Sequence, residues 1–108
     1  MSKPATWTPP DDLDPGCLDV CIALNTHEEI ETYWACEGHN QRRYKVFFRA
    51  PALAAEGLRS CLEGFRDWQI RDCNQPGESN WLLEGPETHR AVLQAERIAK
   101  RIKALAES

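Results

Sequence analysis

The 108-residue sequence predicts an α+β domain of two layers, in which helices pack on a mainly antiparallel sheet of four strands. Segments with a helical period alternate with segments of period two in the order α-β-β-α-β-β-α. Short loops join the strand segments in pairs, which favours antiparallel hairpins. Pro15, Pro51 and Pro86 each precede a helical segment, at the position where proline is favoured.

The first helix is expected to begin at Pro15, after Asp14 as N-cap, and to end near Asn25. From Glu29 the period changes to two, which indicates a half-buried strand. One side of this strand carries Ile30, Thr32, Trp34 and Cys36, and the other carries Glu31, Tyr33, Ala35 and Glu37. Residues 44–49 form the second strand of the hairpin, after a short loop that contains Gly38.

The second half is expected to repeat this order. Pro51 opens a helix that runs to about Glu63 and ends at Gly64. Strands at 65–72 and 80–83 follow, and Pro86 opens the last helix. The residues expected mostly in the core are Ile30, Trp34, Val46, Phe48, Leu58, Leu62, Ile70, Leu82, Ile98 and Ile102.

Residues 1–12 are interpreted as an extended arm, because they hold three of the seven prolines and no hydrophobic period. Trp7 is the one residue that could anchor this arm, and residues 13–108 form a single domain. An internal duplication is suggested by three identities at an offset of 34 residues. They pair Trp34 with Trp68, Asn40 with Asn74, and Gln41 with Gln75.

The composition, 42% hydrophobic and 28% charged, is that of an ordinary folded domain. A net charge of −4 argues against a general nucleic-acid coat. No run reaches the ~18 apolar residues of a membrane span, and no secretory signal follows Met1. We therefore expect a cytoplasmic protein without membrane contact. Five cysteines in a reducing compartment predict no structural disulfide.

Zinc binding is one interpretation of the cysteines, since Cys17, Cys21, Cys36 and His39 together offer four suitable ligands. Cys17 and Cys21 lie four apart on a predicted helix, however, where buried cysteines behave as small hydrophobic residues. A Cys36/His39 nucleophile pair lacks an evident third group to orient the base. We expect core cysteines, and no metal or other cofactor.

An anion-binding site has more support. The loop at Gly38 offers backbone amides, His39 can donate a hydrogen bond, and basic residues follow at Arg42, Arg43, Lys45 and Arg49. The last helix adds a basic stripe of Arg90, Arg97 and Arg101 with Gln94, although for this stripe we favour a solvated helix face over ligand contact. The predicted ligand-binding residues are Trp34, Glu37, Gly38, His39, Arg42, Arg43, Tyr44, Trp81, Arg97 and Arg101.

These residues predict a non-catalytic binding protein, because the sequence has neither a glycine-rich phosphate loop nor an evident pair of catalytic carboxylates. The expected ligand is an anionic small molecule such as a nucleotide, with arginines on its phosphate and an aromatic ring on its base. RNA is a possible partner. We also expect a homo-oligomer that completes the pocket.

Residues 25–39, NTHEEIETYWACEGH, resemble the Asn...Ile-x-Thr...Ser-Cys-x-Gly-His pattern of small phage and bacterial proteins. More distantly, they resemble the Ser-Ser-Cys-Ser-Gly-Arg strand end of the wybutosine-synthesis tRNA methyltransferase family. This chain departs from that motif at Trp34-Ala35, Glu37 and His39.

In size, topology and basic and aromatic residues near the hairpin, the chain is also similar to Thoeris anti-defence proteins. That resemblance implies sequestration of a cyclic nucleotide signal. The resemblance to the methyltransferase family implies RNA modification or RNA binding instead. A small structural zinc-binding interaction module is the third alternative.

Overall fold

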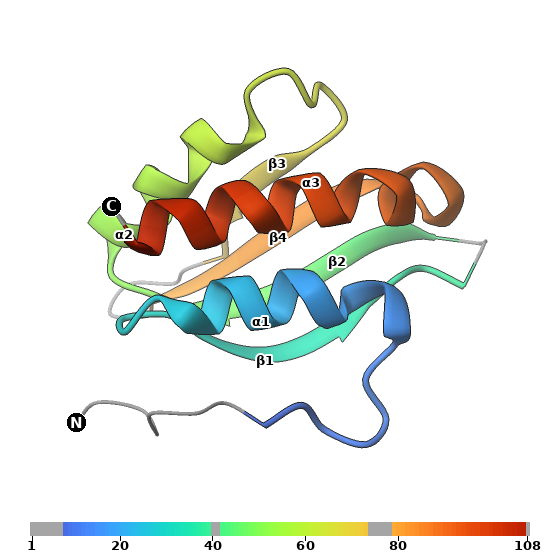
Figure 1. Ribbon diagram of the computed structural model, residues 1–108, viewed down its shortest axis with the longest axis horizontal. Coiled ribbons are helices and arrows are strands. Elements are labelled where there is room, and N and C mark those ends of the chain that lie inside the picture. Colours follow the sequence, from blue (N-terminus) through green and yellow to red (C-terminus); the bar gives the residue numbers. More distant parts are fainter. Residues whose placement is uncertain (1–7, 40–41, 74–78, 108) are drawn as a thin grey trace.

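A computed structural model describes residues 8–39, 42–73 and 79–107 and has the predicted α+β architecture (Figure 1). The elements are the 3-10 helix η1 (Pro15–Cys17), α1 (Leu18–Thr26), β1 (Glu31–Cys36), β2 (Arg43–Arg49), α2 (Ala52–Leu58), the 3-10 helix η2 (Arg59–Leu62), β3 (Gln69–Asp72), β4 (Asn80–Glu87) and α3 (Thr88–Glu107).

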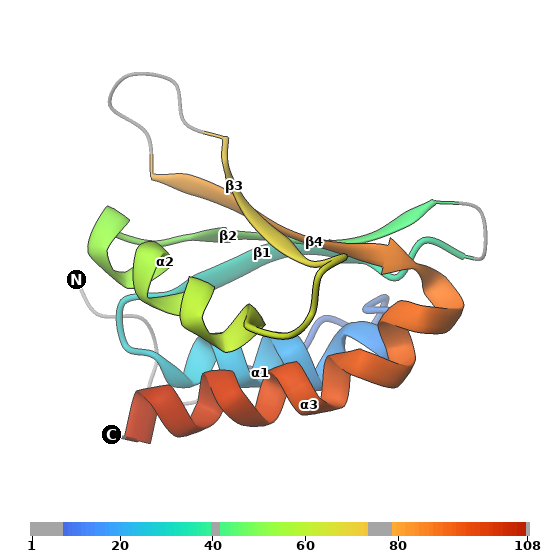
Figure 2. The same cartoon turned by 90° about the horizontal axis from the view of Figure 1, so that it is seen from above.

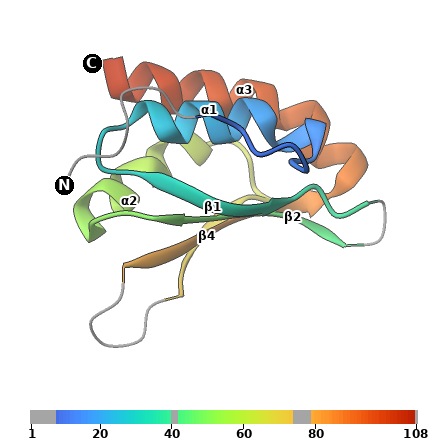
Figure 3. The same cartoon turned by 90° about the horizontal axis from the view of Figure 1, so that it is seen from below.

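The four strands form one sheet in the order β1-β2-β4-β3, and every neighbouring pair is antiparallel. Helices α1 and α3 lie side by side over one face of this sheet (Figures 2 and 3). No helix of the described residues lies over the opposite face. We call the two surfaces the covered face and the open face.

The side chains that the sheet contributes to the hydrophobic core point to the covered face. The register aligns Phe48 with Thr32 and Trp81, and it aligns Val46 with Ala35 and Leu83. Across the helix layer, α3 turns one apolar stripe inward. The described residues of largest volume that are almost completely buried include Tyr44, Phe48, Leu24, Ile30, Leu58, Leu83, Ile98 and Ile102.

Trp34 is the exception among the residues expected mostly in the core, because it is 51% exposed. The cause is a β-bulge in β1, where Tyr33 and Trp34 both lie opposite Phe47. A bulge inserts one residue into the pleat and shifts the alternation beyond it. Trp34 therefore points to the open face, whereas Thr32, two residues earlier, points to the covered face.

The helix boundaries also differ from the expected ones. Pro86 lies inside β4, and α3 begins two residues later at Thr88. The register between β2 and β4 shifts there, from Lys45 opposite Glu84 to Arg43 opposite Glu87. A strand tolerates proline at such an irregularity because no ladder hydrogen bond is lost. In addition, α2 ends at Leu58 and continues only as η2.

The residues that suggested a duplication do not share an environment. Trp68 is 5% exposed and donates a hydrogen bond from Nε1 to Gln94 Oε1 at 2.7 Å. Its ring packs 5.1 Å from that of Tyr44, whereas Trp34 is exposed on the open face. The Asn and Gln pairs, and the arm residues up to Trp7, lie outside the described residues.

Candidate functional site

Three aromatic residues gather on the open face. Trp34 packs edge-on against Phe47 with ring centroids 5.4 Å apart, and Tyr33 lies 6.1 Å from the same ring. Tyr33 and Trp34 are 43% and 51% exposed. The Arg49 guanidinium lies 4.8 Å from the centre of the Tyr33 ring, in cation–π contact. The open face thus presents an aromatic cluster, Tyr33, Trp34 and Phe47, beside a cation.

Beside the aromatic cluster, Glu84 is a nearly buried carboxylate that organises basic side chains. It accepts hydrogen bonds from Gln69 Nε2 at 2.9 Å and from Arg71 Nη1 at 3.4 Å. Arg43 Nε lies 3.9 Å away, and Lys45 is directly opposite Glu84 in the register. Because β2 and β3 flank β4, the register gathers this positive charge although the whole chain carries −4.

Beyond Cys36, the loop that ends β1 is tied to two other elements through Glu37. The Glu37 amide donates to Asp14 Oδ2 at 3.0 Å, and the Glu37 carboxylate accepts from the Gly16 amide at 3.1 Å. Thr88, the first residue of α3, donates its hydroxyl to the Glu37 carbonyl at 2.7 Å. These three bonds fix the loop against the start of η1 and the start of α3.

The backbone turns sharply at Gly38 and His39. Their φ angles are 98° and 50°, and His39 is the only described non-glycine residue with a positive φ. A Cβ on Gly38 would lie 2.1 Å from the Arg42 carbonyl oxygen, so this close approach requires glycine. The turn brings His39 Nε2 to 3.3 Å from Asp14 Oδ2.

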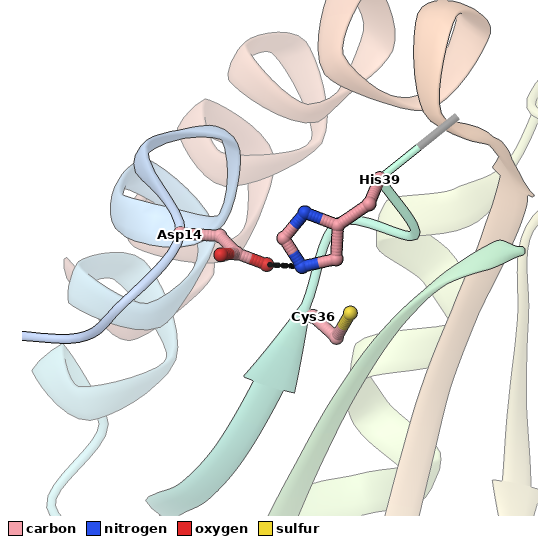
Figure 4. A group of neighbouring side chains, drawn as sticks. All are labelled: Asp14, Cys36 and His39. Carbon is pink, nitrogen blue, oxygen red and sulfur yellow. Dashed lines mark ion pairs between the residues drawn. The ribbon is translucent and has the colours of Figure 1, made fainter. Parts of the chain in front are cut away.

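Cys36, His39 and Asp14 converge at this corner (Figure 4). One ligand atom from each residue lies within 4.8 Å of the other two. Figure 4 shows His39 directing one ring nitrogen at the carboxylate, while its second nitrogen points away from the thiol. A cysteine–histidine–aspartate relay needs the imidazole to contact thiol and carboxylate through different nitrogens, so this arrangement does not favour thiol catalysis.

Cys17 and Cys21 do not join that group. They are 0% and 1% exposed, and burial raises the pKa of the Cys17 thiol to about 12 and that of Cys21 to about 11. Both thiols therefore stay protonated and pack as core residues. Among the described residues, the group with metal-ligand chemistry contains Asp14 in their place.

The predicted ligand-binding residues separate into groups. Trp34 and Arg43 reach the open face, and Arg42 is exposed beside the turn. Tyr44 and Trp81, in contrast, are 0% and 4% exposed, so neither ring is available for stacking. The Tyr44 hydroxyl donates to the Gly16 carbonyl at 3.0 Å, and burial raises its pKa well above the usual value. The Trp81 indole donates to the Ala50 carbonyl at 3.1 Å.

Arg97 and Arg101 lie on α3, which belongs to the helix layer over the covered face (Figure 2). Arg101 is occupied there: its guanidinium lies 4.8 Å from the centre of the Phe65 ring and donates to the Glu63 carbonyl. It borders a shallow depression of about 690 Å³ between η2 and the end of α3. The basic stripe of the last helix is thus not brought together with the His39 turn.

Comparisons with protein-family models, with curated proteins and with solved structures found no match to this chain. Within the residues that the structure describes, no helix is both long and apolar enough to cross a membrane. Self-association and a nucleotide ligand stay predictions.

Proposed function

We propose that this chain is a non-catalytic binding protein whose open face holds a nucleotide by stacking and phosphate contacts. One observation carries the proposal: Tyr33, Trp34 and Phe47 form an aromatic cluster on a sheet face that no described helix covers. Large aromatic side chains gain free energy from burial, so an exposed cluster of them is typical of a binding surface. The adjoining cations select for an anionic partner.

The aromatic cluster supplies the stacking surface. A base stacked on an aromatic side chain contributes about 1–3 kcal/mol, with little dependence on which base it is. Tyr33 and Trp34 each expose roughly half of their surface, enough to leave a ring face or edge for a ligand. Arg49, already over the Tyr33 ring, can stack on a base in the same manner.

The phosphate contacts would come from the basic residues that flank the aromatic cluster. Arginine is suited to this role because its planar guanidinium can form paired hydrogen bonds with phosphate oxygens. Arg49 lies 4.8 Å from the centre of the Tyr33 ring, and Arg71 lies 3.4 Å from the Glu84 carboxylate. These contacts hold both guanidinium groups on the open face. Glu84 limits the attraction at the centre of the face and favours phosphate at its edges.

The shape of the face decides between a flat and an enclosed ligand site. The hollow of about 80 Å³ that Tyr33 and Trp34 border is also lined by Cys21 and Thr32, so it lies at the β1 edge toward the helices and not on the open face. A larger hollow, of about 350 Å³, borders Arg49, but Glu28, Glu29 and Glu31 line it as well. Small-molecule pockets usually measure about 300–1,000 Å³. The hollow at Arg49 reaches this size, but its three glutamates disfavour an anion. We therefore place the ligand across the aromatic cluster, as cyclic nucleotides and short single-stranded RNA can both lie. Stacking chemistry is common to the two, and experiment has to separate them.

Tryptophan fluorescence and thermal shift, recorded against mononucleotides, cyclic dinucleotides and short single-stranded RNA, would test the proposal. Ligand that binds only the folded chain raises the melting temperature by mass action. We expect Trp34→Ala and Arg49→Ala to weaken binding. Leu93→Ala and Arg97→Ala are matched controls, since both residues are exposed on α3, away from the open face.

The nucleotide affinities of these four variants show whether the open face holds the ligand. Loss of binding in Trp34→Ala and Arg49→Ala, with both controls unchanged, would support the open face. Binding only to RNA would identify a single-stranded RNA module, and binding only to cyclic nucleotides would support signal sequestration. Equal effects of Arg97→Ala and Arg49→Ala, or no response to any ligand, would contradict the proposal.

A further inference from the structure

The corner where β1 ends holds three side chains of metal-ligand chemistry, drawn from separate parts of the chain. Asp14 precedes η1, Cys36 ends β1, and His39 follows the turn at Gly38. Their ligand atoms lie within 4.8 Å of one another. The Asp14 side chain is 18% exposed and that of His39 is 65% exposed, so the group opens to solvent on the histidine side.

Two consecutive backbone amides orient the oxygen and the sulfur of this group. The Glu37 amide donates to Asp14 Oδ2 at 3.0 Å, and the Gly38 amide donates to Cys36 Sγ at 3.4 Å. Outer hydrogen bonds of this kind hold metal ligands in place and tune them in known metal sites. Asp14 and Cys36 are therefore positioned by the backbone and not by their own rotamers alone.

We propose that Asp14, Cys36 and His39 bind a zinc ion. Sulfur, nitrogen and oxygen ligands of these three types are the ones that Zn²⁺ takes in proteins. Calcium and magnesium prefer sites made of oxygen atoms, so the thiol and the imidazole disfavour them. With three protein ligands, a tetrahedral ion keeps a fourth position, which the exposure of His39 places toward solvent.

The distances suit such an ion with a small adjustment. Zinc–ligand bonds of about 2.0–2.3 Å place tetrahedral ligand atoms roughly 3.5 Å apart. His39 Nε2 and Asp14 Oδ2 are already 3.3 Å apart. The remaining separations, at most 4.8 Å, need side-chain displacements of about 1 Å to reach that spacing.

The site is separate from the proposed stacking surface but borders it. Cys36 lies opposite Lys45 in the register, at the end of the open face, whereas the aromatic cluster lies around Phe47. Zinc binding therefore does not depend on nucleotide binding, and each can fail without the other. In the absence of metal, the 3.3 Å contact between His39 and Asp14 can be a simple ion pair, and the experiment must distinguish these two states.

Cobalt titration tests the site directly, because Co²⁺ replaces zinc and a cobalt–thiolate bond absorbs in the near ultraviolet. We expect one Co²⁺ per chain with a thiolate band, displaced by one equivalent of Zn²⁺. Cys36→Ser, His39→Ala and Asp14→Asn should each lower zinc affinity by more than the roughly 10- to 100-fold that loss of an outer partner costs. Cys73→Ser, at an exposed residue beyond β3, is the matched control and should bind as the wild type does.

A second measurement on the wild type keeps the proposal testable if a variant fails to fold. Zinc should protect Cys36 from iodoacetamide at least 10-fold more than it protects Cys73, as mapped by mass spectrometry. The absence of a thiolate band, equal protection of both cysteines, or unchanged zinc affinity in folded Cys36→Ser would overturn the proposal. A simple His39–Asp14 ion pair would give that last result.

Discussion

The two faces of the sheet use the same kinds of residue for different purposes. Phe47 and Phe48 are neighbours in β2, yet Phe48 is 0% exposed under the helices while Phe47 lies in the aromatic cluster of the open face. Tyr44 and Trp81 face the core, and Tyr33 and Trp34 face solvent. Residue type alone thus does not determine which aromatic residues stabilise the fold and which can meet a ligand. The direction in which each residue points determines it.

The largest expected difference between the faces is in stability. Phe48→Ala removes a ring from the packed core and should lower the free energy of unfolding by about 3–5 kcal/mol. Phe47→Ala should cost clearly less, since Phe47 is only partly buried on the open face. Urea unfolding followed by circular dichroism measures both. Equal losses for the two variants would show that the open face is as tightly packed as the covered face.

The thiols beneath the covered face predict a pH dependence. Burial raises the folded-state pKa of Cys17 to about 12 and that of Cys21 to about 11, from an ordinary value of 9.0. As pH rises, the unfolded chain loses these protons first. The stabilising contribution of each thiol is therefore complete below about pH 9 and is lost as pH rises toward the folded-state pKa, by up to about 1.4 kcal/mol per pH unit.

Unfolding measured between pH 8 and pH 11 checks this dependence. In a Cys17→Ala/Cys21→Ala variant, stability should start lower but decline less steeply above pH 9. Leu93→Ala, at an exposed residue of α3 that does not titrate, is the comparison, and its slope should equal that of the wild type. A double variant with an undiminished slope would assign the alkaline loss to other groups.

On the open face, the expected effect is on binding instead of stability. Trp34→Ala should weaken nucleotide binding by about 1–3 kcal/mol, the value of one base stack. Its unfolding free energy should change by less than about 1 kcal/mol, because half of the ring is already in water. Titration and urea unfolding of the same sample separate these two effects. A large stability loss with normal binding would place Trp34 with the core residues.

The smallest expected effect concerns Glu84. Glu84→Gln keeps the shape of the side chain and can still accept the bond from Gln69, but removes one negative charge from the open face. Affinity for an anionic ligand should rise roughly 2- to 5-fold, as expected for one charge contact worth about 0.5–1 kcal/mol. Isothermal titration at low and high salt checks it, because salt should reduce the gain. Weaker binding would mean that Glu84 mainly positions Arg71.

Periodicity was sufficient to predict the fold class, because a change from a helical period to period two marks each boundary between layers. It failed at Trp34, because the bulge at Tyr33 breaks the alternation and no residue type in the sequence indicates that Tyr33 is an extra residue in the strand pairing. It also failed at Pro86, which resembles a helix start but lies in an irregular end of β4. Both errors arise from strand pairing, which is a property of two segments and not of one.

The candidate sites show the same limit. The spacing of Cys36 and His39 marks them as candidates, and residue type marks Trp34 and Arg43. Asp14 was interpreted only as a helix cap, since nothing local indicates that a residue before η1 meets the end of β1. Because of this tertiary contact, Asp14 lies beside Cys36 and His39, where the zinc interpretation of the sequence had placed Cys17 and Cys21.

The bulge in β1 has a consequence for how such a surface can be gained or lost. Without Tyr33, the strand would read as a regular alternation, with Thr32 and Ala35 facing the helices and Trp34 and Cys36 facing outward. Tyr33 is in effect a single inserted residue, and its ring adds to the open face without altering any side chain of the core. Insertion of one codon in an edge strand can thus enlarge a recognition surface while the packed interior stays unchanged.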